Sequence, residues 1–211
     1  MRRGVVITAI LLVAGVAGYW LKSRSGIDLI ESFSLQPYLP SFFRVSLPVI
    51  HGGPGALIEE TFEDSHASNR WLRLWAKRKG TVTRGYESGG ADGSRCLTIT
   101  NAGPDHWAYT YRGWIEAAEG DAFRLEGMAK VMGNDEASAA IGIVLHDQEK
   151  RVLEWHYAQG RVKATARWER VEREFVVPSG VAYLTFRVTG RGAGQTKLDG
   201  LRLMKLPPMS G

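Results

Sequence analysis

The chain has 211 residues, 44% of them hydrophobic and 23% charged, which excludes wholesale disorder and leaves room for one domain plus additional segments. Its single cysteine, Cys96, excludes an intrachain disulfide and a cysteine-based zinc site. The formal net charge is +5, but residues 1–57 alone hold five basic and two acidic side chains. The remainder is therefore close to neutral, and a basic face for nucleic acid is not indicated.

Residues 1–25 have the pattern of a membrane anchor or a signal segment. Arg2 and Arg3 precede an uncharged stretch at 4–21, which is near the minimum length for an apolar helix that crosses a bilayer. Cleavage is the alternative, because Gly15-Val16-Ala17 is a small-x-small sequence. We expect a single-pass protein of the inner (cytoplasmic) membrane with its folded part on the periplasmic, extracytoplasmic side, or a secreted protein if the segment is cleaved.

Residues 26–57 are predicted to be a linker. They contain four of the eight prolines and the sequence Gly52-Gly53-Pro54-Gly55, and both residue types disfavour regular structure. Aromatic residues such as Phe42 and Phe43 are also present. The linker therefore either docks on its own domain or contacts a membrane partner.

Residues 58–206 change to a pattern of short strands separated by turns, followed by a tail at 207–211. Apolar residues alternate at 123–131, 139–145 and 184–188, and this period of two places each set on one face of a sheet. Glycine-, asparagine- and aspartate-containing turns lie between such segments. About ten short strands without a long helix predict an all-β fold, a β-sandwich of the jelly-roll type.

The order of these signals resembles the carbohydrate-binding modules of the galactose-binding-like β-sandwich superfamily, of the type appended to xylanases and glucanases. The segments that carry the resemblance are 61–64 with Trp71, 92–99, 168–178 and 198–203. The resemblance implies a jelly-roll sandwich and a glycan ligand. Because this sandwich also hosts protein-binding and structural domains, it indicates the fold more strongly than the ligand.

The resemblance also implies a structural calcium ion between the first and last strands. Calcium binds several oxygen ligands, including carboxylates, and Glu63 and Asp199 match the positions that would supply them. The alternative is that Glu63 is a surface acid and that Asp199 caps a turn.

Two groups of aromatic residues alternate along predicted strands. Trp107, Tyr109 and Tyr111 form the first, and Trp155 and Tyr157 form the second. Flat rings can cover the apolar face of a sugar while polar neighbours bind its hydroxyls, and Arg187 is one candidate neighbour. The alternative is that these rings fill the core between the sheets.

The sequence contains no nucleophile elbow, P-loop or dinucleotide-binding fingerprint, and no pattern pairs two carboxylates as a glycosidase requires. We expect a non-catalytic protein that binds cell-envelope or exported polysaccharide. The alternative is an assembly subunit of an envelope complex that uses the sandwich for protein contacts. Residues 168–174 alternate in charge, which predicts a solvated strand face with cross-strand ion pairs.

Overall fold

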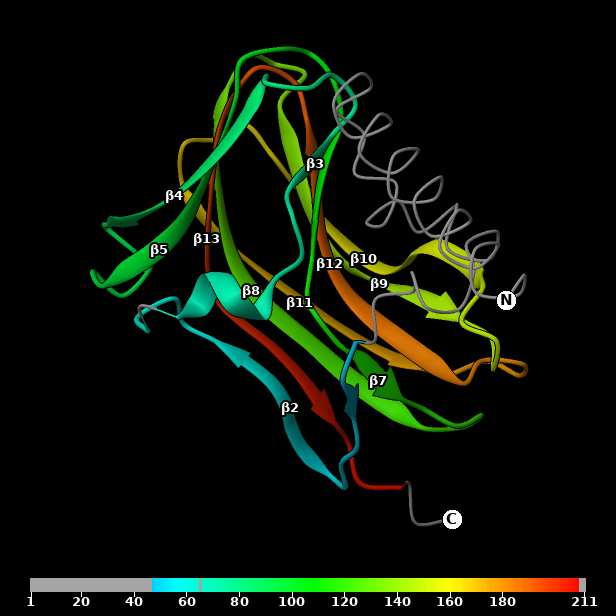
Figure 1. Cartoon of the computed structure of the whole chain (residues 1–211). Helices are drawn as coiled ribbons and strands as arrows, with labels where there is room; N and C mark the ends of the chain where they lie inside the picture. Colours follow the sequence, from blue (N-terminus) through cyan, green and yellow to red (C-terminus); the bar gives the residue numbers. More distant parts are fainter. Residues whose placement is uncertain (1–46, 65, 209–211) are drawn as a thin grey trace, which may run out of the picture. The chain divides into compact units, whose positions relative to one another are not determined.

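The computed structural model describes residues 47–64 and 66–208, which form two β-sheets packed face to face (Figure 1). The predicted anchor and residues 26–46 of the predicted linker lie outside this description. No helix within the described residues is long and apolar enough to span a membrane.

The first sheet is built around β12 (Tyr183–Arg191), which pairs with β9 (Ser138–His146) along one edge. Along the other edge of β12, β6 and β7 follow one another end to end. The remaining strands of this sheet are β1 (Val49–Ile50), β3 (Trp75–Ala76), β6 (Trp107–Thr110), β7 (Trp114–Glu116) and β10 (Val152–Lys163). All of its pairs are antiparallel except that of β1 with β7.

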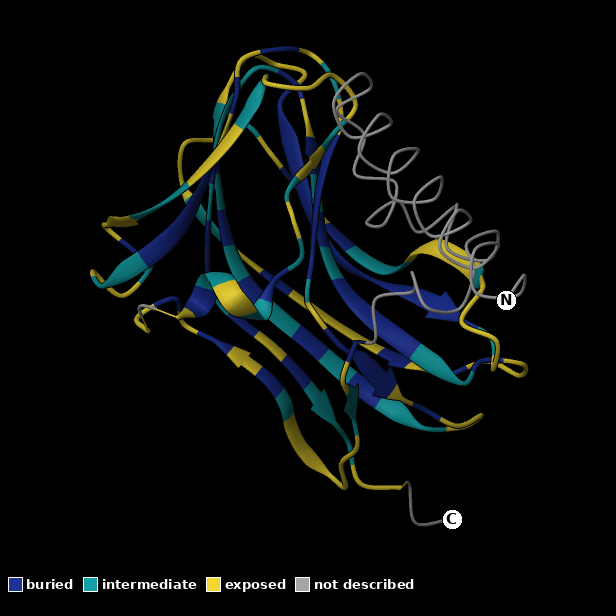
Figure 2. Cartoon of the chain, in the orientation of Figure 1, coloured by how far each residue is buried: buried dark blue, intermediate teal, exposed yellow. Residues whose placement is uncertain are grey.

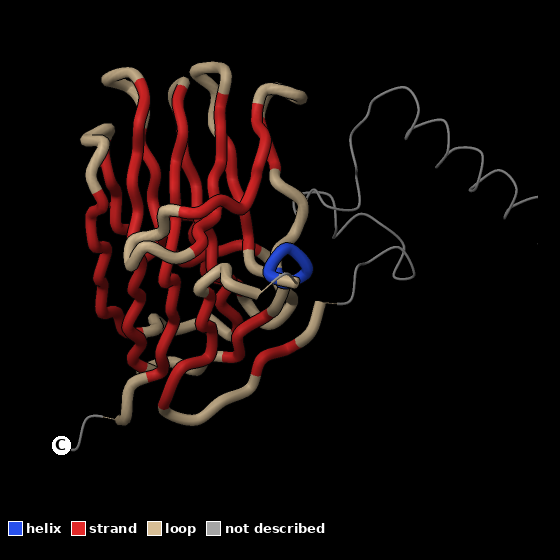
Figure 3. The backbone as a smooth tube through the Cα atoms, turned by 90° about the vertical axis from the view of Figure 1, so that its left-hand side faces the viewer, coloured by secondary structure: helices blue, strands red, loops and turns tan. Residues whose placement is uncertain are grey.

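The second sheet is built around β13 (Gly194–Lys205), with β8 along one edge and with β5 and β2 end to end along the other. Its other strands are β2 (Gly55–Glu60), β4 (Val82–Ser88), β5 (Arg95–Asn101), β8 (Ala122–Gly133) and β11 (Trp168–Val176). Figure 3 shows strands side by side with turns at both ends of the sandwich. The predicted all-β sandwich is confirmed for the described residues.

The predicted alternation sets the burial of the strands. In β8, buried residues alternate with half-exposed ones, and Phe123 and Leu125 are fully buried against the opposite sheet. Figure 2 shows that the buried positions lie mainly along the strands of the two sheets. The strand β9 differs, because all nine of its residues are buried, on both of its faces.

The end of the predicted linker joins the first sheet. Leu47 is buried, and the carbonyl of Pro48 accepts a hydrogen bond from the amide of Trp114 at 2.8 Å. Proline lacks only the amide donor, so its carbonyl can still pair with a neighbouring strand. Strands therefore begin at Val49, before the predicted domain boundary at residue 58.

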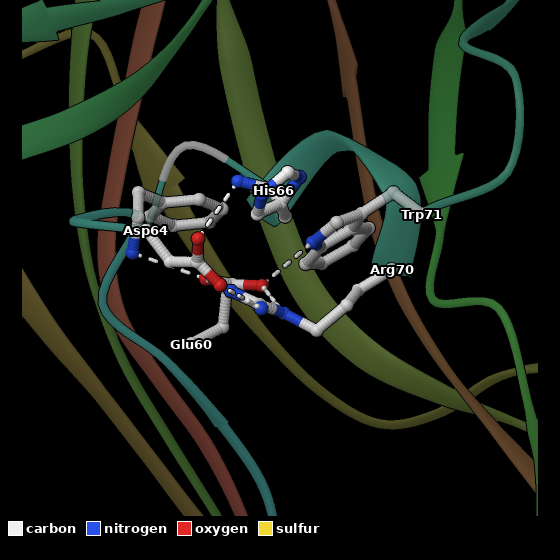
Figure 4. A network of polar contacts seen from close by, with 6 residues as sticks. Glu60, Asp64, His66, Arg70 and Trp71 are labelled. Atoms are coloured by element: carbon white, nitrogen blue, oxygen red, sulfur yellow. Dashed lines mark hydrogen bonds and ion pairs between the residues drawn. The ribbon is translucent and has the colours of Figure 1, made fainter.

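A buried carboxylate holds the chain between β2 and the short 3-10 helix η3 (Ala67–Arg70), as Figure 4 shows. Both oxygens of Glu60, which is fully buried, accept hydrogen bonds from Arg70 at 2.9 Å. The same carboxylate accepts from the indole nitrogen of Trp71 and from the amide of Phe62. Arg70 also donates to Asp64, so the corner is crossed by a network of charged hydrogen bonds.

The outer face of the second sheet carries paired charges. Glu174 on β11 accepts a hydrogen bond from Nε of Arg124 on β8 at 2.8 Å, and Arg170 lies 3.5 Å from Glu126 across the same strand pair. The predicted solvated face at 168–174 with cross-strand ion pairs is confirmed.

Candidate functional site

The outer face of the first sheet combines polar side chains on β12 with very small ones on its neighbours. Phe186 and Val188 point into the core, so Arg187 and Thr189 point outward. Arg187 lies between Thr110 of β6 and Gly142 of β9 in the strand register. Because the neighbouring side chains at the centre of this face are small, the space above them forms a hollow.

This hollow is a pocket of about 220 Å³ over β3, β6, β9, β10 and β12. We call it the basic pocket, because its ionisable side chains are arginines and histidines. Its lining residues are Trp75, His106, Trp107, Ala108, Ser138, Ala139, Ala140, His156, Gln159, Arg161, Arg187, Thr189, Gly190 and Arg191.

One wall of the basic pocket carries an exposed aromatic ring. Trp75 pairs with Ala108, which places both on the outer face, and 51% of Trp75 is exposed. A solvent-exposed indole next to polar groups is able to stack on an apolar ring face of a ligand. Ala108 and Ala140 are both buried, and both are too small to fill the space beside Trp75.

Arg187 is held at the centre of the outer face without a counter-charge. Its guanidinium carbon lies 4.9 Å from the centre of the Trp155 ring, which fixes it by a cation–π contact. Its Nε atom is buried and has no hydrogen-bond partner. Burial lowers the pKa of the Arg187 guanidinium, which nevertheless stays charged at neutral pH.

The first aromatic group packs largely against the core. Tyr109 is fully buried, stacks on Trp71 at 4.8 Å between ring centres and belongs to the core. Trp107 is 2% exposed, and its ring lies against Gly190, where an added Cβ would come within 2.3 Å of it. Tyr111 packs edge-on against Trp71 at 5.6 Å. Tyr109 therefore lies in the core, as the alternative prediction has it, whereas Tyr111 is half-buried against the core and Trp107 contributes only a buried part of the pocket lining.

The second aromatic group is divided between the two sides of its strand. Trp155 faces outward over Arg187 and is 40% exposed. Tyr157 packs edge-on against the core residue Phe175 at 5.6 Å, and its hydroxyl donates to the carbonyl of Val176. The register of β10 against β9 shifts between Glu154 and Tyr157, and this bulge breaks the alternation that the prediction assumed.

The sequence alone did not identify several residues that line the basic pocket, among them Trp75, His106, Gln159, Arg161 and Arg191. One signal was present: the apolar set 184–188 leaves Arg187, Thr189 and Arg191 on the opposite face of the same strand. The contribution of β3 and β10 depends on strand pairing across long sequence distances, which no local pattern reveals.

The two predicted calcium ligands both accept hydrogen bonds from backbone amides. Glu63 accepts from the amide of Arg95 at 2.7 Å, and Asp199 accepts from the amides of Ala91 and Gly200. Burial raises the pKa of Asp199, and the charges of Asp92 and Glu63 add to the effect. No group of three or more acidic, histidine or cysteine side chains able to hold a metal occurs in the described part of the chain.

Calcium also accepts carbonyl oxygens as ligands, and the loop beside Asp199 presents them. The ideal Cβ position of Gly90 lies within 3.1 Å of a carboxylate oxygen of Asp199, the carbonyl of Arg95 and the hydroxyl of Ser94. A carboxylate, a carbonyl and a hydroxyl oxygen therefore converge there, and Glu63 accepts a hydrogen bond from the amide of Arg95, so the donor types fit a calcium shell. Calcium therefore stays a prediction with a suitable donor set.

A second polar cluster lies on the same outer face, around β7. The ring of His146 packs edge-on against Trp114 at 4.8 Å, and its Nε2 lies 3.0 Å from the hydroxyl of Thr185. The ammonium of Lys150 lies over both Trp114 and Tyr183. Burial lowers the pKa of His146 to about 4, so this ring is neutral at neutral pH.

No protein-family model matches the sequence, and no curated protein matches it either. Solved structures with similar folds include the enzymatically active domain of tailspike protein 4 from bacteriophage CBA120, with 16% identity and a TM-score of 0.53 over 69% of this chain. The CBM22-1 and GH10 modules of a Clostridium thermocellum endo-1,4-β-D-xylanase, complexed with xylohexaose, align with 13% identity and a TM-score of 0.54 over 75% of this chain. This chain covers only 20% and 30% of those two chains, respectively.

The xylan-binding domain CBM22-1 of a Paenibacillus barcinonensis xylanase is matched over nearly its whole length. It aligns with 12% identity and a TM-score of 0.52, over 76% of this chain and 98% of that domain. The resemblance to carbohydrate-binding modules of the jelly-roll type is thus confirmed at the level of the fold.

Proposed function

We propose that this protein is a non-catalytic glycan-binding protein and that the basic pocket holds part of a sugar chain. The observation that carries the proposal is the hollow on the outer face of the first sheet, with the exposed ring of Trp75 beside polar side chains. Sugar binding needs this combination, because rings cover the apolar sugar face and polar groups bind the hydroxyls.

A shallow binding role fits the pocket better than catalysis does. A glycosidase needs two carboxylates that face each other across the bound sugar. The fourteen residues that line the basic pocket include no aspartate or glutamate. The similar folds that bind xylan or xylohexaose support a glycan ligand by analogy.

The same proposal includes the location of the protein. The apolar stretch at 4–21 would tether the sandwich to the inner membrane on its extracytoplasmic side, where it would meet cell-envelope or exported polysaccharide. A calcium ion held by Glu63 and Asp199 would act on the stability of the loop around Gly90, which is on the second sheet and away from the basic pocket.

Binding of the full chain to immobilised plant and bacterial polysaccharides tests the proposal, with Trp75→Ala beside the unchanged protein. We expect saturable binding that Trp75→Ala weakens by about ten-fold, since stacking of one ring contributes on the order of 1 kcal/mol or more. Trp168→Ala, on the second sheet, is the matched control and should bind normally. Equal binding by Trp75→Ala and the unchanged protein would remove the pocket from the proposal.

An assembly subunit is the second candidate, and exposed apolar side chains favour it. Leu153 and Trp155 on β10 and Val176 at the end of β11 are 40% to 51% exposed. A hydrogen bond from Tyr157 to the carbonyl of Val176 joins these two strands. Exposed apolar residues of this size occur at protein interfaces.

The two candidates respond differently to the paired change Leu153→Ser and Val176→Ser. An assembly subunit would lose its partner in a pull-down from membranes while its affinity for polysaccharide stayed the same. A glycan-binding protein without such a partner would show no change in the proteins recovered.

A further inference from the structure

The ionisable side chains of the basic pocket are all basic residues. Arg161 comes from β10, Arg187 and Arg191 come from β12, and His106 and His156 complete the set. All fourteen lining residues belong to the described part of the chain, and none of them is acidic. A neutral sugar does not require such a set of donors, because hydroxyls bind equally well to amides and carboxylates.

The three arginines also lack counter-charges among the described residues. None of them forms an ion pair with a described residue, whereas six arginines elsewhere in the domain do. Arg161 makes only a long contact of 3.5 Å with the side-chain oxygen of Gln159. Arg187 keeps a buried Nε without any acceptor. A half-buried cation that lacks an anion has a free-energy cost, which an incoming anion would offset.

The neighbouring acids do not neutralise the pocket. Asp105 pairs with Arg78 at 3.2 Å, outside the lining. Glu154 accepts a hydrogen bond from the amide of His156 and is exposed to solvent. The guanidinium of Arg187 instead lies against the ring of Trp155, and Arg187 is one of the residues that line the hollow.

Building on the proposed glycan binding, we propose that the ligand is an anionic glycan, whose acidic group is bound by Arg187 and Arg161 while its sugar ring lies against Trp75. A guanidinium presents parallel donors that match both oxygens of a carboxylate, and it binds sulfate esters through the same donors. The shared chemistry is an oxyanion carried on a sugar, supplied either by a uronic acid or by a sulfate ester.

The test measures the affinity of the full chain, kept in a mild detergent, for matched pairs of polysaccharides. Polygalacturonate is compared with its methyl-esterified form, dextran sulfate with dextran, and neutral xylan is included. We expect the acidic member of a pair to bind at least about ten-fold more tightly than its neutral counterpart, and this preference should weaken as the salt concentration rises. The pair that shows the preference identifies carboxylate or sulfate as the source.

Three substitutions locate the binding site. Arg161→Gln, which is exposed, and Arg187→Gln should each weaken binding of the acidic polymer by about ten-fold or more. Arg173→Gln is the control, because Arg173 is exposed on β11 in the second sheet and contacts only the backbone carbonyl of Glu172. Thermal unfolding of each variant shows whether it is folded. If Arg187→Gln is unfolded, the result for Arg161→Gln alone decides the test.

The outcomes separate this inference from the proposed function. Equal binding of acidic and neutral members, with loss of both in Trp75→Ala, would overturn the anionic ligand and leave glycan binding in place. Equal weakening by Arg173→Gln and Arg161→Gln would show general charge attraction and overturn the pocket assignment. Binding to none of these polysaccharides would overturn both.

Discussion

The corner between β2 and η3 and the basic pocket each hold a half-buried arginine, and the two differ in what lies opposite the charge. Arg70 donates to both oxygens of Glu60 and to Asp64, and these partners raise its pKa. Arg187 meets no carboxylate, and burial lowers its pKa. The charges of the corner are therefore paired within the protein, whereas Arg187 in the basic pocket forms no ion pair with a described residue.

The largest effect is expected where the paired corner is broken. Glu60→Ala leaves Arg70 paired with the exposed Asp64 but removes its two hydrogen bonds to the buried carboxylate, and it also removes the acceptor of the Trp71 indole and the Phe62 amide. Loss of one partner of a buried ion pair costs about 3–5 kcal/mol. Urea unfolding of both proteins measures this loss of stability.

Glu172→Ala is the matched control for that change. Glu172 pairs with Arg170 at 3.1 Å on the exposed face of the second sheet, where an ion pair contributes up to about 1 kcal/mol. If Glu60→Ala and Glu172→Ala cost the same, the corner has no special role in stability.

Acid should act on the outer face of the first sheet through His146. Its pKa is lowered to about 4 in the folded protein, mainly by burial, whereas an unfolded histidine titrates near 6.5. Below about pH 6.5 the unfolded state binds the extra proton, so the free energy of unfolding falls as the pH drops toward 4, by about 3 kcal/mol. Thermal or urea unfolding across this range measures the slope.

His146→Gln keeps a polar group near Thr185 but cannot take up the proton. The variant should lose the part of the pH dependence between 6.5 and 4 that belongs to His146. The same slope in both proteins would assign the acid sensitivity to other groups.

Asp199 is also destabilised in its charged form, as Arg187 is, because burial and the charges of Asp92 and Glu63 raise its pKa. A cation from solution would offset that repulsion. We expect calcium to raise the melting temperature, with a gain of about 2.7 kcal/mol at a hundred times the dissociation constant. Asp199→Asn should abolish the shift, and absence of a shift in the unchanged protein would leave Glu63 as a surface acid and Asp199 as a turn cap.

The smallest effect is expected for Arg187→Met. The change removes an unpaired charge and a cation–π contact with Trp155, and the two contributions oppose each other. We expect the free energy of unfolding to change by less than about 1 kcal/mol. Arg70→Met, which strands the buried carboxylate of Glu60, should cost about 3 kcal/mol or more. Similar losses in both variants would contradict the contrast between the two arginines.

The fold was predictable from the sequence to the extent that it depends on alternation within single strands. The period of two is a property of the extended chain. It separates buried from half-exposed residues in β8, and in β9 and β12 it identifies the residues that belong to the core, although β9 is buried on both faces. Alternation alone does not say which face is inner. The aromatic residues on β6 were therefore assigned to a ligand platform, although Tyr109 is in the core.

The candidate site was less predictable, because it is assembled from strands that are distant in the sequence. Trp75 reaches the basic pocket only because β3 pairs with β6, and Arg161 only because β10 pairs with β9. Arg187 lies between residues with clear alternation, Phe186 and Val188, which places it on the outer face. Small residues such as Ala140 leave no chemical signal in the sequence, although they create the space that a ligand needs.

The bulge in β10 breaks the usual rule that residues two positions apart in a β-strand lie on the same face. On one side of it Tyr157 is anchored to Phe175, and on the other side Trp155 reaches over the sheet. Because a register shift lies between them, two rings only two positions apart in the chain contact different parts of the molecule, one the core and the other the outer face of the first sheet. One strand thus joins the packing of the two sheets to the face that carries the basic pocket, without a turn in between.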